Sequence, residues 1–188
     1  MARWTKPAMK EVAAEERAAL GLTPMQRFDP YMLAKEHGIS VYPIGELIAS
    51  GCSPDAVKHF EVIRPKVWSA ALMPVGSARF MLVNTGHELV RQRSNMAHEL
   101  GHHLLEHEFQ EIVLGDDGCA MFNATLEKQA TYLAQELLVP EDAAFKMAFR
   151  DQPNEAVAEH FGVSVQFAQM CMMGPRKVVQ RYRAKKGR

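Results

Sequence analysis

One fifteen-residue stretch constrains this chain more than any other. Residues 94–108 read SNMAHELGHHLLEHE and contain four histidines and three glutamates. We predict a helix over 91–108. Helical surfaces rarely need so many titratable groups, so two interpretations compete. Either these side chains hold a metal ion and activate water, or they belong to the solvated surface of a helix.

The first interpretation is favoured by the pattern His98-Glu99-Leu100-Gly101-His102, which matches H-E-x-x-H. Residues four apart on an α-helix lie about 40° apart around its axis, one turn along it, so both imidazoles can face one ion. Glu99 lies about 100° from His98, beside such an ion. There its carboxylate can take a proton from an activated water molecule without displacing the water. The pattern predicts His98 and His102 as ligands and Glu99 as the general base.

Two further features of this helix bear on the site. Gly101 stands mid-helix, where glycine costs about 1 kcal/mol relative to alanine, so we expect another segment to approach closely there and supply the third ligand that zinc needs. A rival pattern, His103-Leu104-Leu105-Glu106-His107, matches the inverted motif H-x-x-E-H. His103 and His107 lie about 140° and 180° from His98, so the two patterns cannot centre one site. We expect the rival residues to form the solvated continuation of the helix.

The third ligand is sought among the acids downstream of His102. They are Glu106, Glu108, Glu111, Asp116, Asp117, Glu127, Glu136, Glu141 and Asp142. On the wheel of a helix predicted over 124–138, Glu127 falls in the apolar stripe, near the small Ala130 and Ala134, and Glu136 falls on the expected solvent side. An inward carboxylate must find a proton or a cation, and a metal supplies the cation. We predict Glu127 as the ligand. The alternative is that Glu127 binds no metal and only interacts favourably, from the first turn, with the helix dipole.

The remaining chain indicates an α+β fold. Helices are expected over 8–20, from Pro30 to Gly38, over 51–63 and over most of the chain after residue 91, ending with 141–149, 154–161 and 164–173. Strands are expected over 39–44 and on both sides of a Gly76-Ser77 hairpin turn. This order of a helix, a short sheet and then helices is typical of α+β proteins.

Composition excludes several classes of protein. The 188-residue chain has a formal net charge of zero, which gives no strong electrostatic case for nucleic acid or membrane. Its three cysteines, Cys52, Cys119 and Cys171, are far apart, which argues against a disulfide framework and fits a reducing compartment. No apolar run approaches the roughly 20 residues of a membrane span, and the charged start does not resemble a secretory signal. We expect a cytoplasmic protein.

A DNA-binding regulator is the alternative function. Residues 154–173 have the helix, glycine turn and helix of a helix-turn-helix, but their second helix contains no Lys or Arg. The last residues, 175–188, contain seven basic residues and no acid. A basic segment of this kind can follow phosphates, although a frayed, solvated terminus is the favoured interpretation. For the helix pair we favour packing on the core, so direct nucleic-acid binding is not the preferred prediction.

The motifs together resemble the ImmA/IrrE family of metallopeptidases. NMAHELGHHLL, followed by EKQATYLAQELLVP, is similar to the family's AHELGH helix and its E-x-x-A-x-x-F-A-x-x-L-L-x-P helix. The resemblance extends over residues 27–174, between an N-terminal helical extension (1–26) and the basic tail (175–188). Thr131 and Leu133 depart from the family's usual Asn and Phe.

The resemblance implies a zincin-like, gluzincin-type core with a small antiparallel sheet, an active-site helix and a C-terminal helical region. It implies a zinc-dependent endopeptidase that uses the ligands and base already predicted, and a protein substrate, a cytoplasmic helix-turn-helix repressor of the XRE type. Manganese or iron would also suit the ligand set. We further expect the substrate to pair with the 78–84 strand, and His103, Tyr132 or Arg150 to steady the oxyanion.

Overall fold

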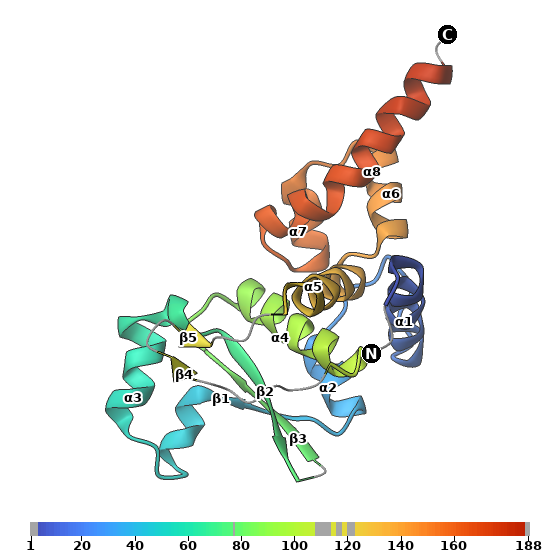
Figure 1. The fold of residues 1–188 in the computed structure, drawn as a ribbon. Coiled ribbons are helices and arrows are strands. Elements are labelled where there is room, and N and C mark those ends of the chain that lie inside the picture. Colours follow the sequence, from blue (N-terminus) through green and yellow to red (C-terminus); the bar gives the residue numbers. More distant parts are fainter. Residues whose placement is uncertain (1–3, 77, 108–113, 116–117, 120–122, 187–188) are drawn as a thin grey trace.

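The computed structural model describes residues 4–76, 78–107, 114–115, 118–119 and 123–186. Helices form one side of the molecule and a small sheet with short helices forms the other (Figure 1). The elements before the sheet's hairpin are α1 (Lys6–Ala19), α2 (Pro30–Glu36), β1 (Ser40–Pro43), η1 (Ile44–Ile48), α3 (Pro54–Lys58), η2 (His59–Ile63) and η3 (Pro65–Val67). From the hairpin onward they are β2 (Ala70–Val75), β3 (Ala78–Val83), α4 (Leu89–Leu104), β4 (Leu114–Gly115), β5 (Gly118–Cys119), α5 (Ala124–Leu138), α6 (Glu141–Phe149), α7 (Asn154–Phe161) and α8 (Val165–Lys186). The predicted α+β class is confirmed.

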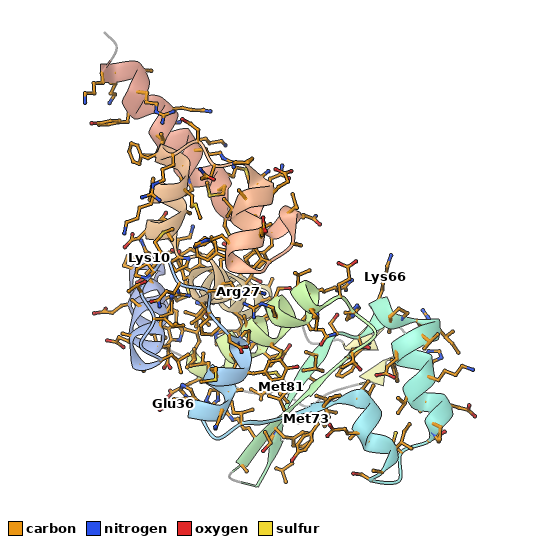
Figure 2. All side chains as sticks on the ribbon, turned by 180° about the vertical axis from the view of Figure 1, so that it is seen from behind. Lys10, Arg27, Glu36, Lys66, Met73 and Met81 are labelled. Carbon is orange, nitrogen blue, oxygen red and sulfur yellow. The ribbon has the colours of Figure 1, made fainter. Side chains whose placement is uncertain are left out.

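The main sheet is mixed and has the strand order β1-β3-β2. β2 and β3 form the predicted antiparallel hairpin around Gly76, with Leu72 opposite Met81, and Ser77 lies outside the described residues. β1 instead runs parallel to β3, so the prediction of a purely antiparallel sheet is wrong. The connection through η1 to η3 leads into β2, which runs opposite to β1, and the hairpin then reverses the chain once more, so β3 runs parallel to β1. Met81, labelled in Figure 2, is fully buried in the core.

This strand order also corrects the expectation that a substrate strand pairs with residues 78–84. β3 is the central strand, and over residues 80–83 it is bonded to β1 on one side and β2 on the other. A strand with two neighbours has no backbone groups left to pair with a third. Among the described residues, the sheet edge beside α4 that pairs with no further strand belongs to β2. Pro74 agrees with that place, because proline cannot donate to a ladder and is confined to edges.

The helical layer is built on α4 and α5, which pack against each other. α1 covers another face of α5, and its Met9 and Ala13 enter the same core as the sheet's Met81. Arg17, also buried, donates hydrogen bonds from its guanidinium to the carbonyls of Leu137, Thr23 and Gln26. The first helix is therefore fixed to the core.

The packing of α1 on α5 and the start of α6 overturn one expectation from the helical wheel. Glu136, expected on the solvent side of α5, is only 7% exposed. Its carboxylate accepts a hydrogen bond of 3.1 Å from the backbone N–H of Glu141, at the start of α6. Lys10 of α1 lies nearby and pairs with Glu141 at 2.7 Å, and Figure 2 shows it where α1 approaches α6. A wheel describes one helix, whereas α5 is covered on more than one side.

The last three helices end in an extended α8. α8 packs on α6 and α7 and then projects away from the rest of the chain (Figure 1). It was predicted to stop at residue 173, with a frayed tail after it, but it is helical through Lys186. Two arginines explain the difference. Arg176 donates to Asn154 Oδ1 at 2.6 Å, and Arg183 donates to Asp151 Oδ1 and to the Phe149 carbonyl, both at 2.8 Å.

Over the described residues, no helix combines the length and the apolar character needed to cross a membrane.

Candidate metal centre

The centre begins with the two histidines of α4. One helical turn brings the His98 and His102 rings to a centroid separation of 4.8 Å. Their Nε2 atoms are 3.1 Å apart. Both side chains are partly exposed, His98 at 26% and His102 at 16%. The pair therefore presents two nitrogen donors in one direction and within reach of solvent.

The third donor comes from the first turn of α5. The Asn123 side chain caps this helix by accepting from the Thr125 backbone N–H. One turn on, Glu127 Oε2 lies 3.0 Å from His98 Nε2, and its Oε1 lies 3.3 Å from His102 Nε2. The ligand atoms of the three residues all lie within 4.8 Å of one another. The structure thus brings together the three residues that the sequence singles out as ligands.

The spacing of these donors fits a divalent ion. Zinc binds imidazole nitrogen and carboxylate oxygen at about 2.0–2.1 Å, so two ligands at a tetrahedral angle lie about 3.3 Å apart. The two Nε2 atoms are 3.1 Å apart, and each lies 3.0 or 3.3 Å from one of the two oxygens of the Glu127 carboxylate, distances close to that value. Two imidazoles and one carboxylate with a side open to solvent also form the ligand set of catalytic zinc sites, which keep one position for water or substrate.

Close packing of the two helices makes this convergence geometrically feasible. A Cβ atom added to Gly101 would lie 2.8 Å from the Ala130 carbonyl oxygen and 3.1 Å from the Ala130 Cα. The prediction that another segment approaches this glycine is confirmed, and the segment is α5. Glu127 lies three residues before Ala130, so it reaches the histidines from the same contact.

The His102 imidazole is held neutral, and the His98 ring has a hydrogen-bonding partner that orients it. Burial, followed by the charge of the neighbouring His98 ring, lowers the pKa of His102 to about 4. Neutral imidazole is the form that binds metals. His98 Nδ1 lies 3.4 Å from the Thr131 hydroxyl oxygen, so the residue that departs from the family's usual Asn still offers His98 a hydrogen-bonding partner.

Glu99 stands between this cluster and the sheet. Burial raises the pKa of its carboxyl to about 7, a hydrogen bond from the backbone N–H of Leu72 opposes the shift, and the charge of Glu127 adds to it. A general base works best when its pKa lies near the working pH. The bond to Leu72 also ties Glu99 to the edge strand β2.

The three residues predicted as candidates for stabilising the oxyanion have other partners or lie elsewhere in the fold. The two ring nitrogens of His103 face Arg79 and His37. Tyr132 is hydrogen-bonded to Glu136, on the face of α5 that α1 covers. Arg150 is the exposed C-terminal cap of α6. Tyr132 therefore lies on a different face of α5 from Glu127, and Arg150 lies at the end of α6, so the structure assigns no oxyanion residue.

The expectation that the residues of the H-x-x-E-H pattern form a solvated continuation of the helix is also wrong. α4 ends at Leu104 instead of continuing to residue 108, and His107 is 6% exposed instead of solvated. The reversal follows from Glu106, whose φ of 52° turns the chain back on the helix. Within the described ranges, the only cluster of three potential ligands is that of His98, His102 and Glu127. Glu108, Glu111, Asp116 and Asp117, which were also considered as ligands, lie outside those ranges.

A small sheet, an H-E-x-x-H helix against its edge strand and an acid from the next long helix together define a metallopeptidase of the zincin-like class. The family model Peptidase_M78, described as the IrrE N-terminal-like domain, matches residues 55–172. The match covers more than half of the chain, which therefore belongs to this family, and the resemblance to ImmA/IrrE metallopeptidases is confirmed. A comparison with curated proteins found no match.

Proposed function

We propose that this metallopeptidase is a zinc-dependent endopeptidase in which His98, His102 and Glu127 hold the ion and Glu99 is the general base. The observation that carries the proposal is the convergence of two imidazole nitrogens and one carboxylate, with nitrogen–nitrogen and nitrogen–oxygen distances of 3.0–3.3 Å, beside a carboxyl whose pKa is raised to about 7. When bound, zinc polarises a carbonyl and lowers the pKa of a water molecule toward neutrality.

The chemistry of the protein groups follows from their positions. Glu99 takes the proton of the attacking water and later gives it to the amine that leaves. The hydrogen bond from the Leu72 N–H holds the carboxylate in place while it does so. The His102 ring, neutral because its pKa is lowered, keeps a lone pair for the ion.

An extended peptide would bind along the open edge of β2. In an antiparallel pair, alternate residues direct their backbone groups away from the partner strand. The Leu72 N–H points toward Glu99, so Ala70 and Pro74, two residues away on either side, face the same open edge. A substrate strand added there would pass Glu99 and the three donors. Strand addition of this kind takes affinity from main-chain hydrogen bonds and specificity from alternate side chains.

For the substrate we propose a helix-turn-helix repressor of the XRE type, cut at a specific site to relieve repression. The support is membership in the IrrE N-terminal-like domain family together with the resemblance to ImmA/IrrE peptidases, which cut such repressors. Zinc is the preferred ion because the donor separations match its short, tetrahedral bonds, while manganese or iron would suit the same donors.

The test is an incubation of the zinc-loaded protein with the repressor encoded beside its gene, with fragments read by mass spectrometry. We expect cleavage at one site and its loss on chelation. Glu99→Gln should still bind zinc but cut roughly 100- to 10,000-fold more slowly. Glu88→Gln, an exposed acid at the start of the same helix, is the control and should cut normally. Wild-type rates in Glu99→Gln would refute the base, and equal cutting of an unrelated unfolded protein would refute the repressor as the specific substrate.

The DNA-binding regulator has less support as a competing proposal. The predicted helix pair corresponds to α7 and the first half of α8, and its Val157, Phe161, Ala168 and Met172 belong to the common core. Two of the basic side chains of α8, Arg176 and Arg183, are engaged by the loop between α6 and α7. Duplex binding that weakens with salt and disappears on removal of residues 175–188 would favour the regulator.

A further inference from the structure

His107 is a buried titratable residue to which the proposed mechanism gives no role. It follows the end of α4 and is 6% exposed, and its neighbour Gln129 of α5 is 8% exposed. Buried polar side chains are normally hydrogen-bonded, and the partners of these two indicate what they do. His107 Nδ1 lies 3.0 Å from His102 Nδ1, and His107 Nε2 lies 3.1 Å from Gln129 Oε1.

A tight turn at the end of α4 brings His107 back to His102. The N–H of Glu106 donates to the carbonyl of His103, and the N–H of His107 donates to the carbonyl of His102. These two bonds form a Schellman motif, whose left-handed position is usually occupied by glycine. Here Glu106 occupies it with a φ of 52°, a conformation that costs a non-glycine residue about 1 kcal/mol or more. The turn places the imidazole of His107 edge-on to the ring of His102, at a centroid distance of 5.0 Å.

The hydrogen bonds run in only one direction. The Gln129 amide NH₂ faces the Trp4 carbonyl at 3.5 Å, and a carbonyl only accepts, so Gln129 Oε1 must face His107. His107 Nε2 therefore carries a proton and donates it to Gln129, which leaves His107 Nδ1 as an acceptor. The 3.0 Å contact between the two Nδ1 atoms then requires His102 Nδ1 to be the donor. As a result, the Nε2 atom of His102 has its lone pair free, and it is this atom that faces His98 and Glu127.

We infer that His107 and Gln129 are positioning residues that fix the orientation and tautomer of His102 so that its Nε2 binds the metal. The inference rests on the proposed metal centre. Partners of this kind hold a ligand ring in place and raise its basicity, and their loss typically weakens metal binding by about 10- to 100-fold. The network also reaches the N-terminal segment, because the Trp4 indole N–H donates to the Leu105 carbonyl at 2.9 Å, beside the turn.

The test compares three variants of the full chain by zinc affinity, measured in competition with a chelator, and by the visible spectrum of the cobalt-loaded protein. Gln129→Leu removes the acceptor and should weaken zinc binding about 10- to 100-fold. Gln129→Glu keeps an acceptor for His107 and should bind within a few-fold of wild type, with the wild-type cobalt spectrum. Gln135→Leu, the same change six residues along α5 at a side chain that contacts Met170, should leave affinity unchanged.

Two results would overturn the inference: wild-type affinity in Gln129→Leu, or an equal loss in Gln129→Leu and Gln129→Glu. Should Gln129→Leu fail to fold, His107→Phe gives the same test, because it keeps a ring but offers His102 no acceptor. Unaltered zinc affinity in His107→Phe would then overturn the inference. Failure of the wild-type chain itself to bind one zinc ion would instead refute the metal centre on which the inference rests.

Discussion

The contact between α4 and α5 at Gly101 gives the sharpest prediction. In an isolated helix, Gly101→Ala would be favourable, because alanine in a helix interior is better than glycine by about 1 kcal/mol. Here the new Cβ would lie 2.8, 3.1 and 3.3 Å from the O, Cα and C atoms of Ala130. All three are backbone atoms of α5, and no side-chain rotation can relieve the overlap.

The magnitude follows from these two opposing terms. Overpacking a core typically costs 1–3 kcal/mol, and a clash with helix backbone belongs near the upper value of about 3 kcal/mol. After the gain of about 1 kcal/mol in helix propensity, the net loss is about 2 kcal/mol. For a chain of this size that corresponds to a fall in Tm of about 4–8 °C. Displacement of α5 should also move Glu127 away from His98 and weaken zinc binding.

The assay is thermal unfolding of the metal-free protein together with a zinc titration. Gly174→Ala is the matched control, since Gly174 lies inside α8 with no neighbouring atom within 4 Å of a new Cβ. The free energy of unfolding of this control should be unchanged or rise by up to about 1 kcal/mol. The gain is limited because residue 174 precedes Pro175, and a residue before proline disfavours the helical conformation. A Tm of Gly101→Ala at or above that of wild type would refute the argument from close packing.

Three further predictions concern other parts of the molecule. Glu106→Gly should raise the free energy of unfolding by about 0.5–1 kcal/mol, because glycine adopts the left-handed conformation without strain, and a loss in denaturant titration would contradict this. Burial raises the pKa of Glu136 above its ordinary 4.5, so the folded state binds the proton more tightly and wild type loses stability as pH rises through the raised pKa. The Tm of Glu136→Gln relative to wild type should therefore increase with pH over that interval, and a difference that shrinks would show that the buried charge carries no penalty. Free zinc at about one hundred times Kd stabilises the folded chain by about 2.7 kcal/mol, so chelation from that state should lower Tm by about 5–11 °C. Glu127→Ala should lack this response, and an equal shift in that variant would exclude Glu127 as a ligand.

The sequence by itself determined those parts of the site that depend on a single helix or on a single close contact between two helices. Two histidines four residues apart must share a face of any α-helix, so His98 and His102 follow from local geometry. An acid in an apolar stripe must find a partner, which singled out Glu127. A glycine in a helix interior indicates close approach, and the structure has α5 at Gly101. The bounds of α5, α6 and α7 also agree with those predicted, because apolar spacing and caps are local signals.

Only the tertiary structure decided what depends on several elements at once. Glu136 is buried because α1 packs on a face of α5 that its own periodicity assigns to solvent, and the first residue of α6 donates a hydrogen bond to its carboxylate. The sheet edge beside α4 is that of β2, because β3 lies between β2 and the parallel strand β1. His107 reaches His102 through a left-handed turn at a residue that is not glycine, which no helical pattern signals. Periodicity reports where a side chain points from its own helix or strand, whereas burial, strand order and hydrogen-bond direction depend on which neighbours arrive there.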